Sequence, residues 1–242
     1  MGKTGTSKPM GTPVIVLSHG SRHPQADTVI DHIAEAARHS SGRDIQVAHL
    51  DFSELTLERA ARTLASAGHR TAVVVPLLFT NAFHMRHDVP EVVASAARAT
   101  DMSLHLAPGL GTGPDMANVV AQQIADHAQL GGVKRLALYS VGSSIPGVNN
   151  TVADFATQVA ILISRMQGAP VSARAFVATG PTANPDAFHS YIDETTVVQP
   201  LFVAPGTLWD CQRERITTGW TSQHLGVALL PIVLQRAEEA IA

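Results

Sequence analysis

The sequence lacks several features that define common protein classes. Its 242 residues include one cysteine, Cys211, which excludes an intramolecular disulfide framework and a zinc site built from thiolates alone. Lysine and arginine together number 17 and aspartate and glutamate 20, so the net charge of −3 gives no general electrostatic footprint for a nucleic-acid backbone. Metal ligands must therefore come from His, Asp or Glu side chains, and we expect no nucleic-acid partner.

Long apolar runs are also missing. The chain has no uninterrupted apolar stretch of the length, about 18 residues, that a membrane-spanning helix needs, and residues 1–13 lack the apolar block of a secretory signal. We expect residues 1–12 to form a disordered tail, and the protein to be cytoplasmic with no membrane partner. Apolar residues make up 45% of the chain, which is enough for a packed core.

Strand-like and helix-like segments alternate along the chain. A β-branched and aliphatic run at 14–17 precedes apolar residues at helical spacing, namely Val29, Ile30, Ile33 and Ala37. Further strands are expected at 45–50, 71–79 and 103–107, and further helices at 57–67, 90–99 and 114–129. This alternation predicts an α/β fold of parallel strands joined by right-handed crossovers, with helices covering both faces of the sheet.

The same plan repeats after residues 130–133, a glycine-containing stretch without periodicity. A strand leads into Ser140-Val141-Gly142-Ser143-Ser144 just as one leads into Ser18-His19-Gly20-Ser21-Arg22, and residues 199–203 correspond to 75–79. We therefore predict two similar lobes, 13–129 and 133–242, each a small parallel sheet of about four strands flanked by helices and related by internal duplication.

The repeat offers a comparison between the two lobes. In the second lobe, Val141 stands at the position of His19 and Leu208 at that of His84. Aliphatic residues at both positions are expected if the first lobe kept a reactive site and the second kept only the scaffold.

Three side chains of the first lobe are predicted to meet at one edge of its sheet. Ligands bind outside the carboxyl ends of parallel strands, and with strand order 2-1-3-4 His19 follows the first strand while His84 lies in the loop after its neighbour, the third. Asp51 ends the second strand. A single histidine at a strand end is more often a hydrogen-bonded core residue, so it is the set of three that favours a site.

This set has a definite chemistry. Two imidazoles and a carboxylate with open coordination positions suit a divalent first-row metal ion such as Fe²⁺ or Co²⁺, and imidazole can also take up a proton near neutral pH. We therefore predict that His19 and His84 are catalytic and that both bind the metal together with Asp51.

Other polar residues near these positions are candidates for binding the substrate. Gly20-Ser21-Arg22 is expected to open the first helix, where backbone N–H groups and the helix dipole favour an anion and Arg22 adds a positive charge. The second lobe offers the analogous Ser143. His87 lies three residues after His84, so one helical turn would place both on one face.

Taken together, these motifs resemble those of the sirohydrochlorin chelatases, ATP-independent enzymes that insert cobalt or iron into sirohydrochlorin. The most specific motifs are Ser18 to Arg22 after the first strand, Leu50-Asp51 with Leu57 following, and Val74 to Leu78 running into His84 to Pro90. The resemblance covers nearly the whole chain and implies two α/β lobes.

The resemblance also implies roles for individual residues. His19 and His84 match the two histidines at which the metal is held and the pyrrole nitrogens lose their protons. Asp51 stands where members of the family commonly carry Glu, and its side chain is shorter by one methylene. Ala82 stands where a glycine is often found two residues before the second histidine.

Metal insertion requires removing water from the metal, bending the macrocycle and removing two N–H protons, and histidine suits the first and last of these tasks. We expect a cleft between the lobes to grip the ring, with its acetate and propionate groups bound by Ser21, Arg22, Arg86 and Ser143, and with His87 close by. The metal, Fe²⁺, Co²⁺ or else Ni²⁺, is then a substrate, and no nucleotide is needed. A monomer is expected because one chain supplies both walls of the cleft.

Two alternatives remain open. A non-catalytic carrier of a metal or tetrapyrrole could share the fold, because such α/β lobes serve many functions. A protoporphyrin ferrochelatase is a closer alternative, but the lack of an apolar membrane-facing stretch favours a soluble, polyanionic substrate.

Overall fold

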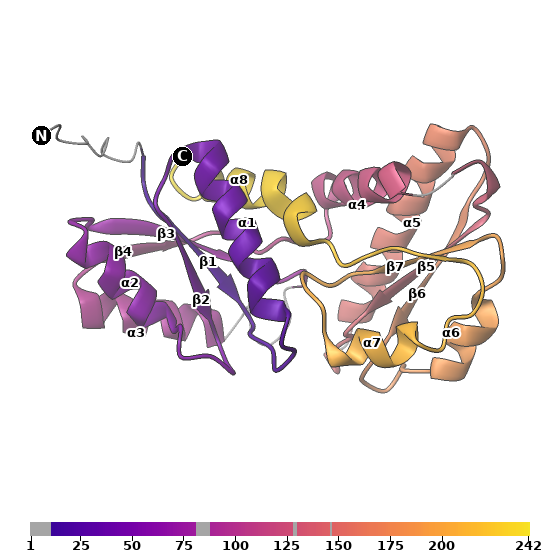
Figure 1. Ribbon diagram of the computed structural model, residues 1–242, viewed down its shortest axis with the longest axis horizontal. Coiled ribbons are helices and arrows are strands. Elements are labelled where there is room, and N and C mark those ends of the chain that lie inside the picture. Colours follow the sequence, from indigo (N-terminus) through magenta and orange to yellow (C-terminus); the bar gives the residue numbers. More distant parts are fainter. Residues whose placement is uncertain (1–10, 81–87, 128–129, 146) are drawn as a thin grey trace, which may run out of the picture.

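The computed structural model describes residues 11–80, 88–127, 130–145 and 147–242, and shows two sheets side by side (Figure 1). Each is a four-stranded parallel sheet, with orders β2-β1-β3-β4 and β6-β5-β7-β8. The first contains β1 (Val14–Ser18), β2 (Ile45–His49), β3 (Thr71–Pro76) and β4 (Ser103–Leu106); the second contains β5 (Arg135–Ser140), β6 (Ser172–Val177), β7 (Thr196–Pro200) and β8 (Trp220–Thr221). The predicted α/β class, the strand order and the two similar sheets are confirmed.

Helices cover both faces of each sheet. They are α1 (Ala26–Ser41), α2 (Leu57–Ser66), α3 (Val89–Thr100), α4 (Pro114–His127), α5 (Val148–Gln167), α6 (Pro185–Tyr191), α7 (Thr207–Arg213) and α8 (Leu230–Glu239), with short 3-10 helices η2 (Leu130–Gly132) and η3 (Gly226–Leu229). Helix α1 shows why these segments fold as they do: Ile30, Ile33 and Ala37 share one buried face, and the helix ends where Gly42 adopts the left-handed conformation.

Alternate residues of β1 enter different cores. Val14 and Val16 face the core that contains α1, whereas Ile15 and Leu17 face the core that contains α2 and α3. Since both faces are covered, all four side chains are fully buried.

The helices α4 and α8 are exchanged between the sheets. Helix α4, which follows the first sheet in sequence, packs against α5 of the second, and α8, at the C-terminal end, packs against α1 and β3 of the first (Figure 1). One hydrophobic core therefore runs without a break from the α1 face of the first sheet to the α5 face of the second. The sequence analysis did not anticipate this exchange.

Arg236 on α8 connects the exchanged helices. Its guanidinium bonds the Asp115 carboxylate at the start of α4 at 2.6 Å and the backbone oxygens of Gly109 and Leu110, both at 3.0 Å. The residue is only 8% exposed, so these charge-assisted bonds hold α4 and α8 at a fixed distance.

The start of α1 differs from the prediction. The helix begins at Ala26, and Gly20-Ser21-Arg22 belongs to the preceding turn rather than to its first turn. Pro24 lies within that turn and delays the helix. The argument that Arg22 lies at a helix N-terminus is therefore wrong. Strand β3 also ends earlier than expected, at Pro76 rather than Phe79.

The half-buried imidazole of His224 makes the fold sensitive to acid. Burial lowers the pKa of His224 from its ordinary value of 6.5, although its bond to the Val203 backbone and the charge of Asp210 oppose the shift. As the pH falls below about 6.5, the unfolded state therefore binds more protons than the folded state, and stability is lost.

We expect the melting temperature to fall from about pH 7.5 to about pH 5, and His224→Gln to make that fall smaller because glutamine does not titrate. Thermal unfolding across this range measures the slope. The control is His32→Gln on the exposed face of α1, which should leave the slope unchanged. Equal slopes for wild type and His224→Gln would contradict the expectation.

Candidate active site

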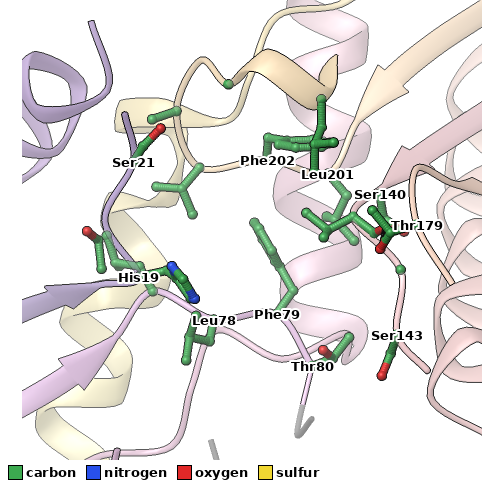
Figure 2. A pocket seen from close by; sticks show the side chains of 18 of the residues that line it. His19, Ser21, Leu78, Phe79, Thr80, Ser140, Ser143, Thr179, Leu201 and Phe202 are labelled. Carbon is green, nitrogen blue, oxygen red and sulfur yellow. Dashed lines mark hydrogen bonds between the residues drawn. The ribbon is translucent and has the colours of Figure 1, made fainter. Parts of the chain in front are cut away.

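A cleft of about 760 Å³ lies between the two lobes, at the carboxyl ends of β1, β3, β5 and β7. Figure 2 shows His19 and Ser21 on one side of it, Ser140, Thr179 and Ser143 on the other, and Phe79 between them. Both walls are thus formed by the loops that leave the carboxyl edges of the two sheets, where parallel sheets bind ligands.

Gly20 fixes the loop that carries His19. Its φ is +92°, and a Cβ atom there would lie 1.9 Å from the backbone oxygen of Asp51. The amide of Asp51 in turn donates to the backbone oxygen of His19 at 2.9 Å. Only glycine allows the two loops to approach so closely, and the half-buried His19 is held at the wall of the cleft as a result.

A buried serine and histidine lie beneath this loop. His49 Nδ1 is 2.6 Å from the Ser18 hydroxyl, which accepts the Gly20 N–H at 3.1 Å. His49 Nε2 is 3.8 Å from a carboxylate oxygen of Asp27, at the start of α1. Burial lowers the pKa of His49, while the charges of Asp27 and Asp31 oppose the shift.

No role was predicted for His49 or Asp27. The signal for His49 was a lone ionisable residue in an otherwise apolar or neutral strand, two positions before Asp51. Its ring now supports the turn that leads to His19.

The backbone of Asp51 is bonded to that of His19, but its carboxylate is bonded to the next residue in the chain. Oδ1 accepts the N–H of Phe52 at 2.8 Å, and Asp51 is an exposed residue outside the cleft lining. Within the described ranges, no three His, Cys, Asp or Glu side chains come together as a metal site. His84, the other predicted ligand, lies outside the described residues, so the three-ligand site remains a prediction.

The remaining candidates are distributed unequally. Ser21 and Ser143 line opposite walls of the cleft. Arg22 is exposed and outside the lining, with its guanidinium 4.7 Å from the centre of the Phe52 ring. Arg86 and His87 lie outside the described residues.

The second lobe repeats the geometry without the histidine. Thr179 N–H donates to the Val141 backbone oxygen at 2.9 Å, just as Asp51 does to His19. Gly142, with φ of +89°, corresponds to Gly20. The predicted match of Val141 to His19 is therefore confirmed, and Val141 and Leu208 both line the cleft.

A histidine–carboxylate contact joins the lobes beside the cleft. His23 Nε2, on the turn before α1, is 3.1 Å from a carboxylate oxygen of Asp210 on α7.

Apolar side chains line the interior of the cleft: Leu78 and Phe79 from the first lobe, and Leu201 and Phe202 from the second. The arrangement suits a ligand with an apolar ring and polar edges.

The fold of two similar parallel-sheet lobes is shared with solved chelatase structures. The structure of SirB from Bacillus subtilis with Fe³⁺ superimposes with a TM-score of 0.76 over 96% of each chain, at 22% identity. CbiX, the terminal enzyme of siroheme biosynthesis in denitrifying bacteria, superimposes with a TM-score of 0.65 over 96% of this chain and 100% of its own, at 16% identity. These likenesses show the fold.

The family resemblance is confirmed in sequence: residues 13–127 match the CbiX family model. The sirohydrochlorin cobaltochelatase of Methanothermobacter thermautotrophicus is 29% identical over 80 residues, 33% of this chain and 56% of its own. The sirohydrochlorin ferrochelatase of Bacillus subtilis is 27% identical over 159 residues, 65% of this chain and 59% of its own. The aligned part of the chain thus spans a little over half the length of these curated relatives.

Proposed function

We propose that the protein inserts a divalent metal ion, Fe²⁺ or Co²⁺, into sirohydrochlorin. The observation that carries the proposal is the placement of His19 at the carboxyl end of β1, on the wall of a cleft between two lobes. The cleft volume, about 760 Å³, is within the range of small-molecule sites. The relatives named cobaltochelatases and ferrochelatases add support from sequence.

In the proposed reaction, His19 binds the incoming metal and accepts a pyrrole proton. His84 shares both tasks, and Asp51 is the third ligand once its carboxylate turns from the Phe52 amide. Imidazole suits this work because it exchanges protons near neutral pH and binds first-row metals. His49 and Ser18 act indirectly, since they hold the turn on which His19 lies.

The apolar interior of the cleft would hold the macrocycle while its edges meet polar groups. Ser21 and Ser143 are placed to bind peripheral carboxylates from opposite walls. Arg22, Arg86 and His87 are the other proposed contacts. Arg22 would have to leave the Phe52 ring to reach the cleft.

We also propose lobe boundaries at 13–129 and 133–242, a monomeric state and a cytoplasmic location. No helix in the described ranges is long and apolar enough to cross a membrane.

Turnover tests the proposal against a carrier. The purified protein is mixed with a molar excess of metal-free sirohydrochlorin and, in parallel reactions, with Fe²⁺, Co²⁺ or Ni²⁺, and the macrocycle absorbance is followed. We expect many equivalents to be metallated per chain, faster than in protein-free reactions. Conversion that stops at one equivalent would identify a carrier, and rates equal to the protein-free reactions with all three metals would refute the proposal.

A further inference from the structure

The two walls of the cleft differ in charge. Among the described lining residues, only His19 and Asp27 have ionisable side chains, and both belong to the first lobe. The second-lobe wall instead presents hydroxyl groups and the start of a helix, with Ser140, Ser143 and Val148 in the lining. The second-lobe wall can therefore receive an anionic group with no carboxylate beside it among the described lining residues.

Ser140 supplies a buried hydroxyl group on this second-lobe wall. It ends β5, is 5% exposed, and its Oγ has no hydrogen-bond partner among the described residues. Its counterpart Ser18 is paired with His49, but the residue in register with Ser140 is Val177. An unpaired buried hydroxyl is costly, so a group that enters the cleft and accepts its proton would be favoured.

The turn after Ser140 is preorganised. Ser143 Oγ accepts the Ile145 N–H at 3.1 Å, which leaves the hydroxyl proton to donate elsewhere. The Asn149 side chain locks the turn to α5, since its Oδ1 accepts the Ser143 N–H at 2.9 Å and its Nδ2 donates to the Ser143 oxygen at 3.0 Å. Helix α5, 20 residues long, begins here, and its N-terminus favours negative charge.

We propose that Ser140, Ser143 and the first turn of α5 form a carboxylate subsite, which binds one acetate or propionate group of the macrocycle. This inference rests on the proposed function, because it takes the substrate to be a polycarboxylate. Because His19 lies on the opposite wall, a carboxylate held at this subsite would also set the orientation of the ring against His19.

The test compares binding of metal-free sirohydrochlorin with binding of the same macrocycle after its carboxylates are esterified. Dissociation constants are measured by quenching of macrocycle fluorescence for the wild type, Ser140→Ala and Ser143→Ala. We expect each variant to bind the acid form about tenfold more weakly, because each loses one hydrogen bond to a charged group, and to bind the ester as the wild type does. Ser40→Ala, on the exposed face of α1, is the control and should change neither constant.

Thermal unfolding separates this role from a structural one. Removing an unpaired hydroxyl should leave the melting temperature of Ser140→Ala equal to or above that of the wild type. Unchanged affinity for the acid form would overturn the subsite, as would equal losses of affinity for acid and ester together with a lower melting temperature. In either case, turnover by the wild type would leave the chelatase proposal intact. A wild type that neither binds nor metallates the macrocycle would remove both.

Discussion

His19→Ala should reduce the rate of Co²⁺ insertion into sirohydrochlorin by about a hundredfold or more, the usual loss when a residue that transfers protons is removed. The expected loss exceeds that for a residue that only transfers protons, since the variant also lacks a proposed metal ligand. The rate is followed through the macrocycle absorbance and compared with the protein-free reaction. His84→Ala is expected to reduce the insertion rate by a similar factor.

His32→Ala provides the matched control, because it removes an exposed histidine on α1 that is absent from the cleft lining. It should insert metal at the wild-type rate. Thermal unfolding of His19→Ala should show a folded protein, since the side chain is only half-buried. A folded His19→Ala protein that retained the wild-type rate would remove His19 from the mechanism.

The largest effect on stability is expected for Gly20→Ala. Alanine would meet the Asp51 backbone oxygen at 1.9 Å and would also occupy a φ of +92°. The left-handed conformation alone costs about 1–2 kcal/mol for a residue with a Cβ atom. The clash adds to this cost and can be relieved only by parting the His19 and Asp51 loops, so we expect a loss of more than about 3 kcal/mol in total.

Gly68→Ala separates the two contributions. Gly68 has the same φ of +92°, but a Cβ atom there has no neighbour within 4 Å. Its alanine variant should therefore lose only the conformational part. Denaturant unfolding gives both free energies, and a Gly20→Ala protein no less stable than Gly68→Ala would show that the two loops separate without cost.

The fold could largely be predicted from periodicity. Both faces of each sheet are covered, so apolar residues recur with the period of the element that buries them. Ile30, Ile33 and Ala37 show this spacing in α1, and the β-branched runs show it in the strands. Helix ends were less predictable. Because Pro24 precedes it, α1 begins only at Ala26, and Arg22 does not lie at the helix N-terminus where an anion site was expected.

The site could be predicted in part. His19 could be placed because it follows a strand, and all strands of a parallel sheet end at the same edge. Ser18 pairs with His49, whereas Ser140 has no hydrogen-bond partner among the residues that the structure describes. Both facts depend on the register between neighbouring strands, which a single sequence does not reveal. The exchange of α4 and α8 was equally hidden, since an apolar helix face does not identify the sheet that it covers.

That exchange determines how the protein can move. Two lobes joined by a single linker could rotate about it. Here α4 and α8 each pack against the opposite sheet, and Arg236 on α8 bonds Asp115 on α4. Wide rotation of one sheet against the other would break the packing of the shared hydrophobic core. The proposed macrocycle would therefore enter a cleft whose two walls keep a nearly fixed separation, and any bending of the ring would be imposed by this rigid frame.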